Sequence, residues 1–182
     1  AQVLEPRAPD GRMDRLREPC RRAVAILFAD LEASGELSRR LSSRAYFELI
    51  RALTDLIDSV VGAHTGILGK HAGDGASALF LAEDAGGDSA AARSAIEAAR
   101  EIRDRATALR DSVRVKVGVH WGATLMVGQV STRGRLEVTA FGDEMNEAAR
   151  IESAATGGIA LASKLLLERL GVNYPRAVVV NH

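Results

Sequence analysis

Hydrophobic residues follow two different periods along the chain, and the change of period separates predicted strands from predicted helices. The apolar run at 23–29 is short and continuous, as in a strand that is buried on both faces. Apolar residues recur every three or four positions at 46–60 and again at 92–109, which predicts two long amphipathic helices. At 113–119 valine alternates with other residues at a period of two, so this segment is predicted to be a strand.

Two β-hairpins are predicted where paired apolar stretches flank turn residues. The first covers 67–81 and turns at 73–75, and the second pairs 125–130 with 135–139. A loop at 83–88 follows the first hairpin. These hairpins indicate that much of the sheet is antiparallel.

The last third of the chain completes the predicted order of elements. A third helix is expected to begin near Asp143, where an acidic residue suits the helix dipole. A short strand near Ile159 and a helix at 164–170 follow it. The alternation of helices and hairpins favours an α+β sandwich, with helices on one face of a mixed, mostly antiparallel sheet.

Composition restricts the classes of partner. Basic and acidic residues balance at 24 each, and aromatic residues make up 4%, so neither a basic surface nor a stacking platform predicts nucleic-acid binding. No apolar run approaches the roughly 20 residues of a membrane span. The lone Cys20 cannot form an internal disulfide, which favours a cytoplasmic location.

The first 22 residues differ from the rest of the chain in composition. They contain Pro6, Pro9 and Pro19 together with many arginines, and they lack a long apolar stretch. We therefore expect residues 1–22 to be a flexible leader or linker, and residues 23–182 to form one folded domain.

Two aspartates lie where functional side chains are often found. Asp30 ends the first predicted strand, and Asp74 lies in the turn of the first hairpin. If the two strands are neighbours, the carboxylates meet at one edge and can hold two hard cations through oxygen. The alternative is a helix-cap aspartate and a turn aspartate without function, since Asp is common at both positions.

Four segments in order change the balance between these alternatives. They read FADLEASGELSRRL, GKHAGDGASALF, VGVHWGATLMVGQV and TAFGDEMNEAARIE. Together they resemble the class III adenylate and guanylate cyclase family from about residue 24 to about residue 166. The resemblance implies a ferredoxin-like fold and an enzyme that forms a cyclic nucleotide from a nucleoside triphosphate.

The resemblance also implies roles for the metal-binding and base-selecting residues. Asp30 and Asp74 match the aspartates that bind two divalent cations, Mg²⁺ or Mn²⁺. Lys70 and Thr139 match the pair that selects the base, and this combination implies adenine and therefore ATP. From the residues alone, a lysine in a hairpin strand would be a solvated side chain, and a threonine would reflect strand propensity.

Asn146 and Arg150 match the family pair that stabilises the transition state. They are four residues apart and so share one face of the predicted helix, and a guanidinium suits the charge on an α-phosphate. Without the resemblance, the pair would be interpreted as part of a solvated helix face.

The predicted phosphate-binding turn departs from the family pattern. The amides of Ser34 and Gly35 are expected to face the triphosphate, but relatives usually have Gly-Phe-Thr where this chain has Ala33-Ser34-Gly35. Glu32 and Glu147 replace residues that are commonly aliphatic, and 174–182 lacks the late hairpin with a triphosphate-binding lysine.

The function implied is that of an adenylate cyclase working as a homodimer. Two chains would pair head to tail, with each active site shared between them. The resemblance implies that one chain gives Asp30 and Asp74 to a site, and that its partner gives Lys70, Thr139, Asn146 and Arg150. The alternatives are a cyclase-like dimeric nucleotide sensor with little or no turnover, and a diguanylate cyclase, whose Gly-Gly-Asp/Glu-Glu-Phe signature does not occur in this chain.

Overall fold

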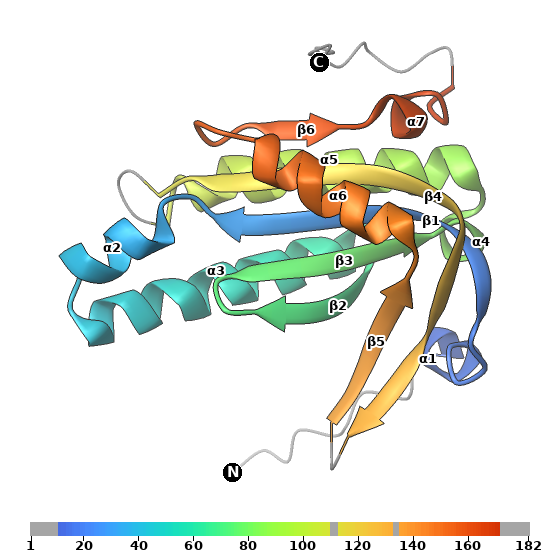
Figure 1. The fold of residues 1–182 in the computed structure, drawn as a ribbon, viewed down its shortest axis with the longest axis horizontal. Helices are drawn as coiled ribbons and strands as arrows, with labels where there is room; N and C mark the ends of the chain where they lie inside the picture. The colour runs from blue at the N-terminus through green and yellow to red at the C-terminus, as the bar shows by residue number, and fades with distance from the viewer. Residues whose placement is uncertain (1–10, 110–112, 133–134, 172–182) are drawn as a thin grey trace.

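A six-stranded sheet organises the part of the chain that the computed structural model describes, residues 11–109, 113–132 and 135–171 (Figure 1). Five strands lie in the order β2-β3-β1-β4-β5 with antiparallel pairing, and β6 pairs with β4 in parallel. The strands are β1 (Cys20–Leu31), β2 (Ile67–Ala72), β3 (Gly75–Leu81), β4 (Val115–Thr132), β5 (Arg135–Phe141) and β6 (Ala160–Ala162).

Helices connect these strands in the order of a ferredoxin-like fold. The unit β1-α3-β2-β3-α5-β4 is a βαββαβ arrangement, which confirms the predicted fold class. The helices are α1 (Gly11–Arg15), α2 (Ser34–Arg40), α3 (Ser43–Ala63), α4 (Ala82–Ala85), α5 (Asp88–Ala106), α6 (Asp143–Ala154) and α7 (Lys164–Leu167).

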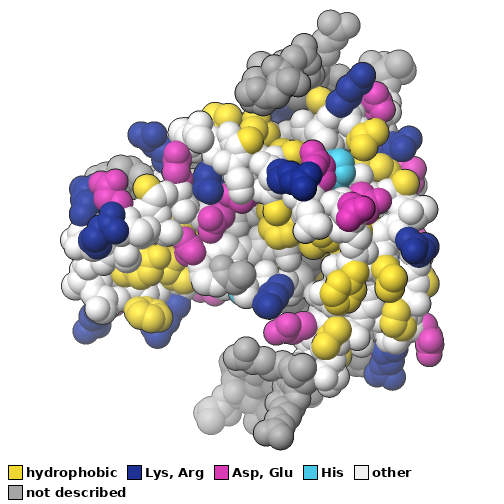
Figure 2. All heavy atoms as spheres, in the orientation of Figure 1, with side chains coloured by type: hydrophobic (Ala, Val, Ile, Leu, Met, Phe, Trp, Pro, Cys, Tyr) yellow, Lys and Arg dark blue, Asp and Glu magenta, His cyan; other side chains and the backbone are white. Residues whose placement is uncertain are grey.

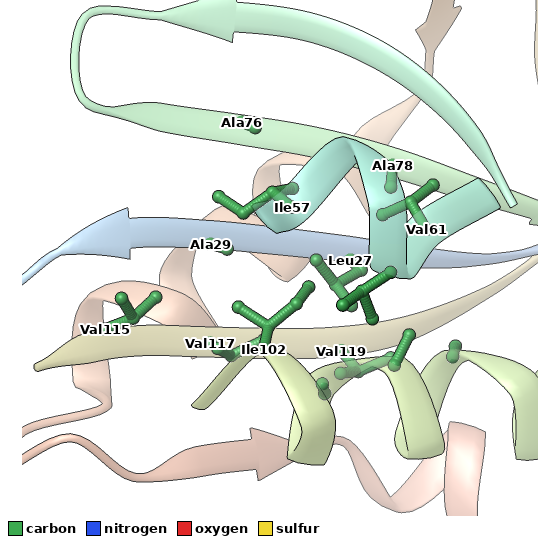
Figure 3. Close-up of a cluster of buried hydrophobic side chains, with 14 of the residues drawn as sticks. Leu27, Ala29, Ile57, Val61, Ala76, Ala78, Ile102, Val115, Val117 and Val119 are labelled. Carbon is green, nitrogen blue, oxygen red and sulfur yellow. The ribbon is translucent and has the colours of Figure 1, made fainter. Parts of the chain in front are cut away.

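The main hydrophobic core lies between the sheet and the pair α3 and α5. Because side chains alternate across a strand, Leu27 and Ala29 of β1 and Val117 and Val119 of β4 point to this side. They meet Ile57 of α3 and the other apolar residues of the two helices (Figure 3). The helical periods in the sequence therefore mark the faces that the core buries.

The opposite face of the sheet is covered in part by α6, whereas the sequence predicted helices on one face only (Figure 1). Ala148 of α6 packs with Ile26 and Leu125 in a second, smaller core. The helix comes so close that a Cβ on Gly118 would lie 2.2 Å from the backbone nitrogen of Glu152. The side chains of the even-numbered residues of β1 therefore point to the face of the sheet that α6 covers in part.

Strand β4 is one continuous element of 18 residues, where the sequence predicted two separate strands. Gly118, inside this strand, marks the close approach of α6. Beyond Val127, where the pairing with β1 ends, β4 and β5 extend as a two-stranded arm. Figure 2 shows hydrophobic side chains gathered over this arm and its base, whose exposed members are Met126, Val130, Leu136 and Phe141.

The folded domain begins earlier than residue 23, the boundary that composition suggested. Helix α1 precedes Leu16, which is fully buried in the second core. Arg15 forms an ion pair with Asp84, and Arg22 forms one with Glu83. Residues 11–22 are thus packed and paired, while 1–10 and the predicted segment 174–182 lie outside the described residues.

Candidate active site

A cavity of about 390 Å³ opens between the ends of β1, β2 and β3 and the strand β5. Four of the predicted site residues line it: Asp30, Asp74, Lys70 and Thr139. These residues come from four different segments of the chain, so the fold brings the predicted metal-binding and base-selecting residues together.

The two aspartates meet because β1 and β3 are neighbours. Asp30 pairs with Gly75 in the antiparallel register, which places it beside the turn that carries Asp74. Burial, together with the negative charges of Asp74 and Glu152, raises the pKa of Asp30. The Oδ2 atom of Asp74 is buried and has no hydrogen-bond partner among the described residues. Repelling carboxylates with an unpartnered oxygen are what a cation would stabilise.

Lys116 and Glu152 complete the charged group, and the sequence analysis did not single them out. Lys116 lies opposite Asp30 in the register of β1 and β4, and its Nζ is 3.7 Å from Asp30 Oδ2. The same Nζ is 2.9 Å from Glu152 Oε1 on α6, and Glu152 is 8% exposed. The available signal was a lysine between the alternating valines of this strand, but only the pairing of β1 with β4 identifies its partner.

The donor set suits a hard divalent cation. Carboxylate oxygens are the ligands that Mg²⁺ and Mn²⁺ prefer. The described residues contain no group of three or more His, Cys, Asp or Glu side chains placed to hold a metal. Asp30 and Asp74 would therefore supply the protein oxygens, and water and substrate phosphate the remainder, as is usual for Mg²⁺.

Lys70 and Thr139 lie on two strands that reach the cavity from different sides. Lys70 is on β2, and its side chain is exposed. Thr139 is half-buried on β5, where it pairs with Gly128 of β4. Both side chains thus have room to contact a ligand in the cavity.

Asn146 and Arg150 do not line this cavity within the single chain. They line a second, more open cavity of about 710 Å³ beside α6, together with His120 and Lys164. Arg150 forms an exposed ion pair with Glu147, with 3.1 Å between Nη1 and Oε2. The six residues therefore divide into two groups, four on one cavity and two on the other.

The predicted phosphate-binding turn lies at the start of α2, outside both cavities. Ala33 adopts the left-handed conformation, with φ 56° and ψ 34°, and precedes Ser34 and Gly35. This conformation favours glycine, so alanine is strained here. Glu32 accepts a hydrogen bond from the amide of Gly157 at 2.8 Å. That bond accounts for one of the two glutamates that departed from the family pattern.

Tyr46 of α3 is a further residue that the sequence analysis assigned only to a helix face. Burial, together with the nearby negative charge of Asp74, raises the pKa of Tyr46. Its phenol therefore lies near the predicted metal-binding residues. The helical period predicted that this residue would pack against the core, and it does so in part.

The fold and the grouped aspartates are those of a nucleotide cyclase domain. The chain belongs to the family described as adenylate and guanylate cyclase catalytic domain, whose model matches residues 17–171. This confirms the resemblance to class III cyclases. Domains of this family use divalent metal ions and act as dimers on a nucleotide substrate.

Both adenylate cyclases and guanylate cyclases are among the known proteins that are similar to this chain. Adenylate cyclase 1 of Rhizobium meliloti (strain 1021) is 30% identical over 144 residues, which is 75% of this chain but only 21% of that protein. The crystal structure of the adenylyl cyclase CyaB from P. aeruginosa has a TM-score of 0.76 at 23% identity, covering 84% of this chain and 82% of the other. The guanylyl cyclase Cya2 has a TM-score of 0.66 at 25% identity, covering 84% and 80%.

Two further facts concern the share of the relative that the chain covers and the character of its helices. The chain spans about a fifth of the length of the Rhizobium relative. Among the helices that the structure describes, none has the length and apolar character to cross a membrane.

Proposed function

We propose that this domain is an adenylate cyclase that converts ATP to 3′,5′-cyclic AMP and pyrophosphate. The observation that carries the proposal is the position of Asp30 and Asp74 together on one cavity of a domain that belongs to the cyclase family. The family provides the reaction class, and the base-selecting pair provides the choice of ATP. We further propose that the domain works in the cytoplasm as a homodimer.

Asp30 and Asp74 would hold Mg²⁺ or Mn²⁺ against the triphosphate. Two such cations, when bound, lower the pKa of the ribose 3′-hydroxyl and neutralise the leaving pyrophosphate. Lys116 partly neutralises the carboxylates of the site, because its ammonium lies between Asp30 and Glu152. The aspartates can then remain close together without a cation.

Lys70 and Thr139 would recognise the edge of the adenine ring. An ammonium donates to adenine N1, which is an acceptor, whereas guanine N1 carries a hydrogen. A site built to form such a bond rejects the base that cannot form it. Adenine is therefore favoured over guanine, although relatives of both kinds share the fold.

Asn146 and Arg150 would complete the site in a dimer. They lie on a different cavity from the aspartates within one chain, as expected if a partner chain provides them. Arg150 would bind charge on the α-phosphate, and Asn146 would orient the ribose or that phosphate. The exposed apolar residues of the β4–β5 arm offer a surface for the partner. The role of Ser34 and Gly35 at the triphosphate stays a prediction.

A second candidate function is a dimeric nucleotide-binding module with weak turnover. Two observations favour it: the strained Ala33 beside the predicted phosphate-binding turn, and the pairing of Arg150 with Glu147. Such a module would bind the same nucleotide as the first candidate but would form little cyclic product from it.

The two candidates separate in one assay. The protein is incubated with Mn²⁺ or Mg²⁺ and either ATP or GTP, and the products are resolved by chromatography and mass spectrometry. Cyclic AMP formed from ATP faster than cyclic GMP is formed from GTP supports the adenylate cyclase. Nucleotide binding without a cyclic product, at a protein concentration where the dimer is present, supports the sensor instead.

A further inference from the structure

The strand that carries Lys70 is irregular at that residue. Pairing between β2 and β3 joins Leu68 to Ala78 and His71 to Ala76, so β2 has one residue more than β3 between these pairs. Gly69 and Lys70 together therefore stand opposite Ser77. This is the geometry of a β-bulge, which redirects a side chain and is frequent beside active sites.

The hydroxyl of Ser77 replaces the ladder bonds that the bulge removes. Ser77 Oγ accepts a hydrogen bond from the amide of Lys70 at 3.1 Å, and it donates one to the carbonyl oxygen of Lys70 at 3.4 Å. Both backbone groups of Lys70 are thus tied to one side chain. The backbone of Ser77 itself pairs with Phe28 of β1, in the interior of the sheet.

The surroundings leave the hydroxyl little freedom. Ser77 is 8% exposed and lines the cavity next to Gly69 and Lys70. A Cβ on Gly69 would lie 2.8 Å from Ser77 Oγ and 3.6 Å from the carbonyl oxygen of Val138. Glycine at 69 therefore provides the space in which the hydroxyl reaches the backbone of Lys70.

We propose that Ser77 is a positioning residue that fixes the bulged backbone of Lys70, and so aims the lysine at the base of the bound nucleotide. The inference rests on the proposed function, because it assumes that Lys70 reads the base. It adds a residue of β3, on the other strand of the hairpin, to the set that determines the choice between ATP and GTP. Ser77 would touch neither substrate nor metal, and it would act only through Lys70.

The test compares Ser77→Ala, Ser77→Cys and Lys70→Ala by the ratio of kcat/KM for ATP to kcat/KM for GTP. Binding of 3′-deoxy-ATP and 3′-deoxy-GTP, which lack the attacking hydroxyl, gives the corresponding ratio of dissociation constants without turnover. In S77A and S77C the ratio should fall about three- to tenfold, the effect of one hydrogen bond, mainly through a higher KM for ATP. Cysteine keeps the shape of serine but bonds weakly, so it separates hydrogen bonding from packing.

Two controls exclude a general loss of structure. Thr107→Ala removes another hydroxyl that bonds to a backbone carbonyl, that of Asp104 at 2.7 Å, at the end of α5 and outside the cavity. It should leave the ratio unchanged. Thermal unfolding of each variant reports stability, and a merely destabilised enzyme would lose activity toward both nucleotides equally.

The double variant S77A/K70A decides whether Ser77 acts through Lys70. Its ratio should equal that of K70A, because no lysine remains to be positioned. A ratio unchanged in S77A and S77C while K70A lowers it would overturn the role of Ser77 and leave base reading intact. A further fall in S77A/K70A would also overturn it. An unchanged ratio in K70A would remove base reading by Lys70, and with it the role of Ser77.

Discussion

The ammonium of Lys116 lies 3.7 Å from Asp30 Oδ2, directly across the register of β1 and β4. The same ammonium lies 2.9 Å from the carboxylate of Glu152 on α6. One side chain therefore joins a predicted metal ligand on the sheet to the helix that carries Asn146 and Arg150. It gives the cavity a fixed positive charge beside its carboxylates.

Removing that charge should destabilise the domain. In Lys116→Met the carboxylate of Glu152 stays buried without its partner, which should lower the free energy of unfolding by about 2–3 kcal/mol. Chemical denaturation measures this loss. Glu147→Gln on the same helix breaks only an exposed pair and should change stability by no more than about 0.5 kcal/mol.

The pH dependence of this loss has a definite sign. Glu152 is the main cause of the raised pKa of Lys116. A raised lysine pKa contributes stability that is complete below the ordinary value of about 10.4 and is lost as the pH rises through the folded value. The difference in the free energy of unfolding between wild type and K116M should therefore stay constant from about pH 6 to about pH 9. A difference that vanished within this range would contradict the ion pair.

Replacing either aspartate should abolish turnover and preserve the fold. Asp30→Ala or Asp74→Ala removes a carboxylate from the proposed cation site, and a loss of about a thousandfold or more is expected. Asp58→Ala is the matched control, because Asp58 is an exposed carboxylate of α3 outside the cavity. Substantial metal-dependent activity in D30A or D74A, with circular dichroism unchanged, would refute the site.

Glycine at position 33 should stabilise the protein. Ala33→Gly relieves a left-handed strain of about 1–2 kcal/mol and adds unfolded-state entropy worth about 0.4–1 kcal/mol. A net gain of about 0.5–1 kcal/mol is expected. The same substitution inside α3, Ala52→Gly, should cost about 1 kcal/mol. If A33G also destabilised the protein, Ala33 would not be strained in solution.

Exchange of the base-selecting pair should move the substrate preference. Lys70→Glu with Thr139→Cys replaces a donor with an acceptor, which suits guanine N1–H and leaves adenine N1 facing a carboxylate. The rate with ATP should fall and the preference should shift toward GTP. Arg44→Glu, which makes the same charge change at an exposed position of α3, should leave the preference unchanged. If the ratio of the ATP rate to the GTP rate in K70E/T139C were the same as in the wild type, the pair would not read the base.

Mixed dimers test whether two chains share each site. Asp30→Ala and Arg150→Ala should each be nearly inactive, but equal mixing should restore about a quarter of wild-type activity, because half the dimers are mixed and each has one intact site. Subunit exchange is verified by a tagged pull-down. Absence of recovery despite exchange would mean that each chain builds its own site.

A second mixture assigns Lys70 to one chain or the other. Within one chain, Lys70 and the two aspartates line the same cavity, whereas the family places this lysine in the other active site of the dimer. Mixing Asp30→Ala with Lys70→Ala should raise the activity with ATP above the mean of the two variants assayed alone if Lys70 acts across the dimer, because each mixed dimer then has one intact site. No recovery in this mixture, with recovery in the first, would place Lys70 beside the aspartates of its own chain.

The sequence predicted those parts of the fold that short-range patterns determine. The periods of β1, α3 and α5 identified the main core, and the turn at Asp74 identified the first hairpin. The motifs singled out Asp30 and Asp74 for metal binding and Lys70 and Thr139 for base selection, and within one chain all four line the same cavity. Whether they act as proposed stays a prediction.

What the sequence missed depends on contacts between distant segments. Leu16 is surrounded in the sequence by charged residues and prolines, so no hydrophobic period predicted its burial. In the structure it is fully buried against strands of the sheet. Lys116 and Ser77 had ordinary positions on their strands, and their partners follow only from the register of the sheet. The division of Asn146 and Arg150 from the other four residues likewise required the tertiary structure.

Gly118 acts as a spacer for the whole site. Since a methyl group there would meet the backbone of Glu152 at 2.2–2.6 Å, any larger residue would push α6 away from the sheet. The helix carries Asn146, Arg150 and Glu152 as one rigid unit, so all three would move together. The absence of a Cβ at Gly118 thus fixes the distance between α6 and the sheet that holds Asp30. A substitution at this position would open the proposed site without changing any residue that lines it.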